Sequence, residues 1–421
     1  MPALDSGDTG WVLVCTALVM LMTPGLAFFY GGMVRAKSVL SMLMQNYVCL
    51  AVVTVAWVVL GYTLAFGGDL GGGLLGDFHF TGLAHVDDVP PGYDLHVPPM
   101  LFMAFQLMFA VLTTALISGA VADRVRFGAF VAFAALWSVL VYAPLAHWAF
   151  APSGWMARFG ILDFAGGYVV EINCGAAALA IALVVGHRHG WPRDAMPPHS
   201  LPLTLLGAGL LWFGWFGFNA GSALRADGLA VHALVNTHLA GAGGLIAWIG
   251  MERLRNGAAT TLGAASGAVA GLVAITPACG YLDPLPALLL GLVAGGACVL
   301  SVQLKYRAGY DDALDVVGVH FVGGIIGTLY LGLFASDSFN PGVVREGLLY
   351  GGGLDLLGRQ AVGVLAVTAF SFCATYLVAR AVDLVLPLRV SEEAEVTGLD
   401  QALHSESAYD FGSVRSMGRI G

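Results

Sequence analysis

Long apolar stretches recur along almost the whole chain, and they constrain the fold more than any other feature of the sequence. About 20 apolar residues in helical form cross a hydrocarbon core of roughly 30 Å. A hydropathy window of about 19 residues identifies eleven such stretches, which begin near residues 10, 40, 98, 127, 163, 199, 228, 259, 284, 313 and 357. Hydrophobic residues make up 58% of the 421 residues and charged residues 11%, which excludes an ordinary soluble protein. The sequence therefore predicts an all-α polytopic membrane protein with eleven transmembrane helices.

Charged residues are distributed unequally between the loops on the two sides of the predicted membrane. Lys and Arg gather in the loops that follow odd-numbered stretches, whereas the intervening loops are acidic or nearly uncharged. The basic residues of these loops are Arg35, Lys37, Arg124, Arg126, Arg188, Arg193, Arg253, Arg255, Lys305 and Arg307. Because short cytoplasmic loops carry an excess of Lys and Arg, the N-terminus is predicted outside and the C-terminus inside. The formal net charge of −9 argues against nucleic-acid binding.

The order of the stretches predicts two related halves followed by a tail. We expect a transmembrane domain over residues 1–386, with inverted repeats over about 10–190 and 199–335 and a long eleventh helix over about 357–386. Five spans in each half force the two halves to insert upside down relative to each other. From 387 to 421 the chain becomes polar and acidic, which predicts a cytoplasmic C-terminal tail.

Polar residues occupy matched positions in two of the stretches. Asp163 precedes Glu171 by eight residues, and Asp312 precedes His320 by the same spacing. Eight helical residues rise about 12 Å. Because the two stretches are predicted to enter from opposite faces, Glu171 and His320 are expected at similar depth near the membrane midplane. Ionisable side chains at that depth are typical of ion and proton paths.

Structural roles stay open for the same four residues. Glu171 taken alone fits a carboxyl hydrogen-bonded to a neighbouring helix, and His320 taken alone fits a packed core imidazole. An aspartate in the first turn caps a helix and complements its dipole. For Asp163, capping and function are equally open, whereas for Asp312 the sequence favours capping. The matched depth of Glu171 and His320 favours a functional pair.

The sequence contains little that predicts catalysis. The glycine-rich stretch GGDLGGGLLGD at 67–77 lacks the GK[ST] ending and the preceding strand of a phosphate-binding loop. We expect no cofactor, no metal site and no enzymatic activity, so any transport is predicted to follow existing gradients.

Several motifs together closely resemble the ammonium transporter family. They are PGLAFFYGG at 24–32, FAGG after Asp163, WFGFNAGS at 215–222, TPACGY at 276–281 and GVHFVGGIIG at 318–327. The resemblance covers nearly the whole chain. It implies passage of ammonium or ammonia through a multi-pass protein of the cell membrane. It further implies a homotrimer whose tail crosses to the neighbouring protomer and responds to a trimeric signal protein of the PII class.

The family also implies roles for individual residues. Phe109, Phe150 and Ser222 match an outer site that recruits ammonium, and we expect Asp163 to belong to the same substrate-binding site. Phe150 stands where the family commonly has tryptophan, and phenylalanine is the weaker cation–π partner. Phe109 and Phe218 match a pair of stacked phenylalanines that close the pore. Trp215 is expected to line or support the pore below them, or to serve packing alone.

The family's usual pore carries two facing histidines, of which this chain keeps His320 and has Glu171 in place of the other. A carboxyl and an imidazole titrate as a coupled pair. We expect Glu171 to preserve conduction while shifting its pH dependence and ion selectivity. An ammonium receptor with little flux is the alternative from a different functional class. A gas channel of the Rhesus type is disfavoured, because the motifs match ammonium transporters more closely.

Overall fold

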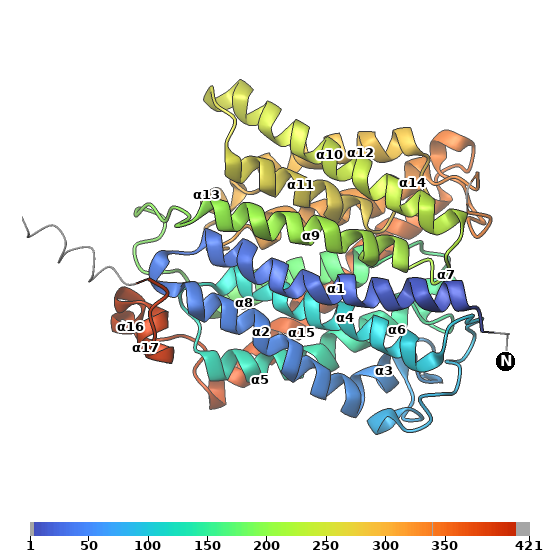
Figure 1. The fold of residues 1–421 in the computed structure, drawn as a ribbon, viewed down its shortest axis with the longest axis horizontal. Helices are drawn as coiled ribbons and strands as arrows, with labels where there is room; N and C mark the ends of the chain where they lie inside the picture. The colour runs from blue at the N-terminus through green and yellow to red at the C-terminus, as the bar shows by residue number, and fades with distance from the viewer. Residues whose placement is uncertain (1–3, 339, 410–421) are drawn as a thin grey trace, which may run out of the picture.

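Helices of membrane-spanning length make up most of the computed structural model, which describes residues 4–338 and 340–409 (Figure 1). Within these residues, ten helical spans are long and apolar enough to cross a membrane. They are Ser6–Met33, Ala36–Phe66, Pro99–Val121, Phe127–Ala149, Gly167–Val185, Leu201–Gly221, Gly228–Asn256, Pro284–Ala308, Val317–Phe334 and Asp355–Val385. The prediction of a helical, polytopic membrane protein is confirmed.

Several of these spans are built from consecutive helical segments. The α-helices are α1 (Ser6–Met33), α2 (Val39–Ala56), α3 (Tyr62–Phe66), α4 (Pro99–Ile117), α5 (Phe127–Trp137), α6 (Ala143–Ala149), α7 (Trp155–Phe159), α8 (Asn173–Val185), α9 (Leu201–Gly221), α10 (Gly228–Asn256), α11 (Thr261–Ile275), α12 (Pro284–Ser301), α13 (Leu304–Ala308), α14 (Val322–Phe334), α15 (Asp355–Val385), α16 (Glu392–Thr397) and α17 (Leu399–His404). Wider π-helical turns are η2 (Trp57–Gly61), η5 (Ser138–Tyr142), η6 (Gly167–Ile172) and η7 (Val317–Phe321). Short 3₁₀ turns are η1 (Ala36–Ser38), η3 (Thr81–Leu83), η4 (Ser118–Val121) and η8 (Leu348–Tyr350), and a small hairpin pairs β1 (Asp69–Leu70) with β2 (Leu75–Gly76).

The eighth predicted span is shorter than the others. α11 has 15 residues, which is less than the roughly 20 that a helix needs to cross the hydrocarbon core. Pro277 follows two residues after its end, and proline disfavours helical geometry in the residue before it. The chain then runs through residues 276–280 as buried turns, so protein rather than lipid surrounds this irregular backbone.

Small residues allow the first and sixth spans, α1 and α9, to lie side by side (Figure 1). A Cβ on Gly207 of α9 would stand 2.1 Å from the Phe29 backbone nitrogen of α1. A Cβ on Gly32 would stand 2.4 Å from Thr204 Oγ1. Glycine at such contacts lets helices approach closely where lipid offers no hydrophobic driving force between them.

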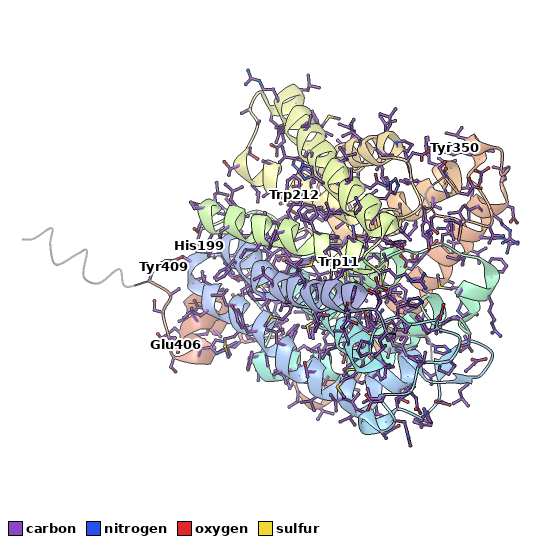
Figure 2. The ribbon with its side chains drawn as sticks, turned by 45° about the vertical axis from the view of Figure 1, so that its right-hand side comes forward. Trp11, His199, Trp212, Tyr350, Glu406 and Tyr409 are labelled. Carbon is purple, nitrogen blue, oxygen red and sulfur yellow. The ribbon has the colours of Figure 1, made fainter. Side chains whose placement is uncertain are left out.

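The C-terminal tail folds back on the loops at one end of the bundle, opposite the end where the described N-terminal residues lie (Figure 1). Asp400 accepts hydrogen bonds from the backbone N–H groups of Leu40 and Ser41 at 3.0 and 2.8 Å. Lys37 donates to the Glu395 carbonyl at 2.9 Å. Further along the tail, Tyr409 lies beside His199, with 2.8 Å between the hydroxyl oxygen and Nε2 (Figure 2). The basic loops around 35–38, 124–126 and 186–189 therefore share one end of the molecule with the tail.

Candidate functional site

Three helices each turn one face toward the same axis through the bundle. Trp215, Phe218 and Ser222 follow an i, i+3, i+7 spacing along α9, which stacks their side chains on one face. Phe102, Gln106 and Phe109 follow an i, i+4, i+7 spacing along α4, as do Met22, Leu26 and Phe29 along α1. These faces line a pocket at the end of the bundle opposite the tail, called the outer pocket below, and a cavity in the middle of the bundle.

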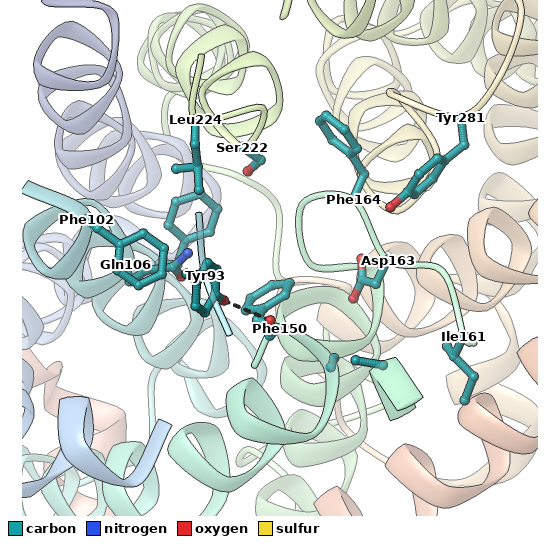
Figure 3. Close-up of a pocket in the computed structure, with 13 residues that line it drawn as sticks. Tyr93, Phe102, Gln106, Phe150, Ile161, Asp163, Phe164, Ser222, Leu224 and Tyr281 are labelled. Carbon is teal, nitrogen blue, oxygen red and sulfur yellow. Dashed lines mark hydrogen bonds between the residues drawn. The ribbon is translucent and has the colours of Figure 1, made fainter. Parts of the chain in front are cut away.

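The outer pocket has a volume of about 310 Å³ and is largely aromatic (Figure 3). Its lining includes all four predicted substrate-binding residues, Phe109, Phe150, Asp163 and Ser222. It also includes residues that the sequence did not identify: Tyr93, Phe102, Gln106, Ala149, Ala157, Ile161, Phe164, Leu224 and Tyr281. Gln106 was within reach of sequence analysis, because it lies one helical turn before Phe109 on the same face of α4.

Several polar side chains that line this pocket carry oxygen acceptors. Ser222 Oγ donates to the Phe218 carbonyl at 2.8 Å, which leaves its oxygen lone pairs available. Gln106 Oε1 has no hydrogen-bond partner among the described residues. Tyr93 donates to the Phe150 carbonyl at 2.8 Å and so fixes the backbone beside the Phe150 ring (Figure 3). The arrangement offers ring faces and oxygen acceptors to a small cation.

Asp163 is the one acidic side chain among the described residues that line the pocket. Its Oδ1 accepts from the N–H groups of Gly166 and Gly167 at 2.8 and 2.7 Å, and its Oδ2 accepts from Tyr168 N–H at 2.9 Å. Burial raises the pKa of Asp163 to about 6, although these backbone donors favour the ionised form. Asp163 therefore caps the fifth span and also brings an ionisable carboxyl to the pocket.

Two phenylalanine rings, one from α4 and one from α9, pack against each other beside the outer pocket. The ring centroids of Phe109 and Phe218 lie 4.3 Å apart, and both side chains are buried. The Trp215 ring lies 5.7 Å from Phe218 on the cavity side, and its Nε1 donates to Thr276 Oγ1 at 2.8 Å. Trp215 thus lines the cavity and also bonds to a neighbouring helix end.

Glu171 and His320 meet in the inner cavity. His320 Nδ1 lies 2.7 Å from Glu171 Oε2, and both side chains are almost fully buried. Glu171 Oε1 has no other hydrogen-bond partner among the described residues. The remaining lining is apolar apart from Trp215, and the cavity volume of about 10 Å³ is close to the minimum that holds a single water molecule. An acid and a base therefore share one short hydrogen bond in a small, mostly apolar cavity.

The two helices that carry this pair have the same local construction. Both residues lie within π-helical turns, η6 and η7. Asp163 accepts from the backbone N–H five residues later, and Asp312 does the same with Val317 N–H at 2.7 Å. π-Helical turns are rare and often occur at functional sites. Neither the turns nor this capping distance was predicted from the sequence.

Glycines bring the two helices into contact beside the pair. Gly175 follows Glu171 by four residues, and a Cβ there would stand 2.5 Å from the Phe321 backbone nitrogen. Gly324 follows His320 by four residues, and a Cβ there would stand 2.9 Å from Glu171 Cβ. The absence of side chains at these two positions allows the carboxyl and the imidazole to reach each other.

A second large pocket, of about 480 Å³, opens at the tail end of the bundle. It is lined by Met33, Arg188, Trp191, Pro192, Arg193, Asp194, Ala195, Met196, Pro198, Leu262, Lys305, Tyr306, Ala313, Leu314 and Asp315. Arg188 is held by two hydrogen bonds to the Asp311 carboxylate, at 2.9 and 2.7 Å. Burial alone would lower the pKa of Arg188, but the Asp311 carboxylate outweighs burial and raises it. This ion pair fixes the rim of the pocket.

Groups of metal-ligating residue types occur twice among the described residues: Glu171 with Cys174 and His320, and His79 with His85 and Asp88. In the first group the Cys174 thiol donates to the Glu171 carbonyl, while the carboxyl and imidazole bond to each other. The first group is therefore linked by hydrogen bonds, with only Glu171 Oε1 of its side-chain oxygens left unpaired by the described residues.

Comparison with known proteins identifies the family of the chain. Residues 10–409 match the model of the Ammonium Transporter Family. The ammonium transporter of Mycobacterium tuberculosis is 50% identical over 435 aligned positions, covering 97% of this chain and 91% of that protein. The ammonium transporter of Bacillus subtilis is 48% identical, covering 96% of this chain and 99% of that protein.

Solved structures of ammonium transport proteins have a fold similar to that of this chain. The crystal structure of Saccharomyces cerevisiae Mep2 superimposes with a TM-score of 0.87 at 34% identity, covering 93% of this chain and 89% of that one. A structure named as a sensor Amt protein superimposes with a TM-score of 0.86 at 29% identity, covering 94% and 98%. With ten apolar spans among its described residues, the protein is a multi-pass protein of the cell membrane, and the chain belongs to the ammonium transporter family.

Proposed function

We propose that the protein conducts ammonium or ammonia across the cell membrane along the axis from the outer pocket to the tail-end pocket. The observation that carries this proposal is the order of groups on that axis. An aromatic pocket with one carboxyl is followed by the Phe109 and Phe218 rings and then by the buried pair of Glu171 and His320. A dry path that begins with cation-binding groups and contains an acid–base pair suits a protonated amine.

Recruitment of ammonium rests on the outer pocket. Phe109 and Phe150 provide ring faces, and cation–π attraction reaches about 2 kcal/mol when the cation is desolvated. Ser222 and Asp163 supply oxygen acceptors for the N–H groups of ammonium, which potassium and sodium lack. Ionised Asp163 adds attraction for a cation at the pocket floor.

Selectivity follows from the narrow apolar section below the pocket. Moving an intact, unpaired ion through a nearly dry cavity carries a large desolvation penalty. Ammonium lowers that penalty because, once past Phe109 and Phe218, it can give its proton to the Glu171–His320 pair and continue as neutral ammonia. Glu171 and His320 share a proton site at 2.7 Å and provide the groups that accept and return it. In this proposal Glu171 takes the place of a histidine and shifts the pH dependence of conduction.

A current measurement tests the proposal. Proteoliposomes on a solid-supported membrane receive an ammonium jump, with potassium as the control cation, and wild type is compared with His320→Ala and Glu171→His. The proposal expects ammonium-dependent current in wild type, loss of that current in His320→Ala, and a different pH profile in Glu171→His. Matching currents and pH profiles in wild type and Glu171→His would refute the role given to Glu171.

Ammonium sensing with little flux is the second candidate, and the likeness to the sensor Amt structure motivates it. A sensor binds ammonium in the outer pocket and signals through the tail, which contacts several loops at the far end. Retained ammonium binding without current or ammonia flux in wild type would select this function.

Assembly and orientation complete the proposal. We infer an N-outside, C-inside arrangement of eleven spans in a 5+5 inverted repeat, because the basic loops share one end with the tail and the two π-helical turns have matching caps. We further propose a homotrimer and a PII-class partner at the tail end. Native mass spectrometry tests the first, and co-purification of the PII protein with full-length but not tail-truncated chain tests the second.

A further inference from the structure

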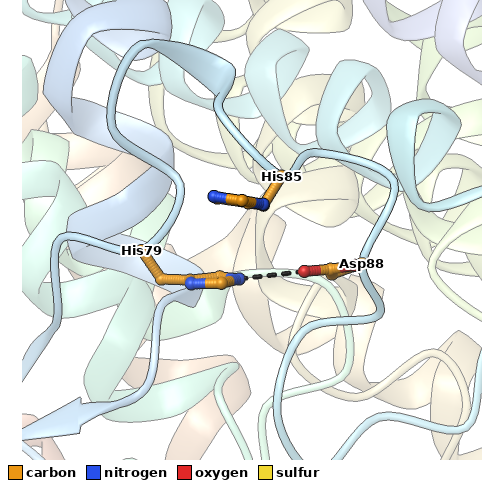
Figure 4. A group of neighbouring side chains, drawn as sticks. All are labelled: His79, His85 and Asp88. Atoms are coloured by element: carbon orange, nitrogen blue, oxygen red, sulfur yellow. Dashed lines mark hydrogen bonds and ion pairs between the residues drawn. The ribbon is translucent and has the colours of Figure 1, made fainter.

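A compact group of histidine and aspartate side chains lies on the loop between α3 and α4, away from the proposed path (Figure 4). His79, His85 and Asp88 each present a ligand atom, and these atoms lie within 4.8 Å of one another. His79 Nε2 is 3.0 Å from Asp88 Oδ2, and the His85 ring stacks on the His79 ring with 4.8 Å between centroids. We propose that these three residues form a binding site for a divalent transition-metal ion of the zinc type.

The ligand chemistry matches such an ion. Two imidazoles with one carboxylate are a common three-residue set for zinc, and the fourth position is left to water or another small ligand. Bond lengths of about 2.0 to 2.2 Å around a tetrahedral ion place neighbouring ligand atoms roughly 3.3 Å apart. The 3.0 Å separation of His79 and Asp88 is already close to that value. The ligand atoms of the group lie within 4.8 Å of one another, so His85 completes the set after a side-chain movement of at most about 1.5 Å.

Access for an ion is open. The side chains of His79 and Asp88 keep 45% and 60% of their surface exposed, and His85 is exposed as well. Calcium and magnesium are poor candidates, because they prefer six or more oxygen ligands to imidazole nitrogen. The chemistry of the three donors therefore selects a borderline transition metal.

Buried neighbours fix the backbone that carries the three ligands. Phe80 follows His79 and is 1% exposed; its N–H donates to Thr63 Oγ1 at 2.9 Å, and its ring packs 5.2 Å from that of Tyr62. Val86 follows His85 and is also buried. Asp88 N–H donates to the His85 carbonyl at 2.9 Å. Because the main chain is held at these points, binding requires movement of side chains only.

Zinc titration of the full chain, purified without a histidine tag and stripped with a chelator, tests the site. Isothermal titration calorimetry with zinc chloride is expected to show one ion per chain. His79→Ala, His85→Ala and the isosteric Asp88→Asn are each expected to weaken binding at least tenfold. All three side chains are exposed, so the variants are expected to keep the wild-type size-exclusion profile and thermal midpoint.

Matched controls separate this site from other metal ligands in the chain. His96 lies on the same end of the molecule with Asp8 and Asp94 each 3.9 Å away, and His96→Ala is expected to bind zinc as wild type does. Cys174→Ser tests the buried group that includes Glu171 and His320, and it too is expected to leave binding unchanged. The zinc absorption edge of the complex is expected to report two imidazole nitrogens. Absence of zinc binding in wild type, unchanged binding in His85→Ala, or loss of binding in Cys174→Ser would each overturn the proposal.

Discussion

The helix that carries Glu171 and the helix that carries His320 share one backbone design and differ in the group that each presents to the cavity. Each has an aspartate eight residues earlier that accepts the N–H five residues after it, a π-helical turn at the ionisable residue, and a glycine four residues later. The caps, π-helical turns and glycines allow the two helices to cross closely. The Glu171 and His320 side chains provide the acid and the base. The frame can therefore be retained while an acid or a base occupies the same place.

Asp163 and Asp312 cap helices of similar construction, but their hydrogen bonds and surroundings differ. Asp163 makes three backbone hydrogen bonds and faces the outer pocket. Asp312 Oδ2 accepts a hydrogen bond from Val317 N–H at 2.7 Å, and its Oδ1 has no partner among the described residues. Burial raises the pKa of both carboxyls to about 6. Of the two, only Asp163 lines the outer pocket, where its carboxylate can attract a cation.

The largest effect is expected from removing the base of the central pair. His320→Ala leaves the Glu171 carboxyl buried without its hydrogen-bond partner, and leaving a buried polar group unsatisfied costs about 1 to 3 kcal/mol. Ammonium current is expected to vanish and the thermal midpoint in detergent to fall. Glu171→Gln is the matched variant: it keeps a hydrogen-bonding amide beside His320 and is expected to lose current with a much smaller fall in the midpoint. Equal destabilisation by both variants would contradict the paired arrangement.

Glycine substitution at the crossing tests the shared frame. Gly175→Ala places a methyl group 2.5 Å from the Phe321 backbone, and overpacking of this kind costs about 1 to 3 kcal/mol. Gly324→Ala meets Glu171 Cβ at 2.9 Å and is expected to destabilise less. Gly209→Ala is the control, because nothing lies within 4 Å of its Cβ and it sits inside α9. Thermal unfolding in detergent gives the order, and a midpoint for Gly175→Ala at or above that of Gly209→Ala would show that the crossing tolerates a methyl group.

The pH dependence of ammonium affinity is expected to distinguish the roles of Asp163 and Asp312. With a pKa of about 6, Asp163 is ionised at pH 7 and mostly protonated at pH 5, so apparent ammonium affinity is expected to fall several-fold as the outer solution is acidified. Asp163→Asn is expected to abolish that dependence, whereas Asp312→Asn is expected to retain it. Ammonium-dependent current measured at a series of outer pH values reports both. A flat profile in wild type would remove Asp163 from the outer site.

The same raised pKa predicts the sign of a stability effect. The folded Asp163 carboxyl binds its proton more tightly than the unfolded one, whose pKa is near 3.8. This contribution therefore favours the folded state below pH 3.8 and is lost as the pH rises from there to about 6. The difference between the thermal midpoints of wild type and Asp163→Asn is expected to change in that direction over that interval.

The smallest effect concerns the aromatic wall. Phe150→Trp provides a stronger cation–π surface in the outer pocket, and a gain of about 0.5 to 1 kcal/mol raises ammonium affinity roughly two- to five-fold. Phe78→Trp serves as the control, because Phe78 is 61% exposed on the outer loop and does not line the pocket. Half-saturating ammonium concentrations from current measurements give the comparison. Lower affinity in Phe150→Trp than in wild type would show that ring size rather than ring strength governs the pocket.

Local sequence determined the long helical spans and led us to expect Glu171 and His320 to lie together. Transfer of an apolar segment into lipid depends on the residues of that segment, so hydropathy alone identified the ten long spans. Fixed rise per residue likewise sufficed to expect Glu171 and His320 at matched depth, and the two groups lie 2.7 Å apart. Composition could not reveal that α11 stops at Ile275, because its end depends on a proline and on buried turns beyond it.

Tertiary structure alone decided which groups meet across the bundle. Tyr93 and Tyr281 reach the outer pocket, Asp400 caps the start of α2, and His79 reaches Asp88 because of how the intervening chain packs. Each of these contacts depends on helix crossings and loop paths that glycine contacts and buried hydrogen bonds fix in three dimensions. A hydropathy pattern records how deep a residue lies in the membrane. It does not show which residues of other helices or loops a side chain contacts. Those contacts form the site.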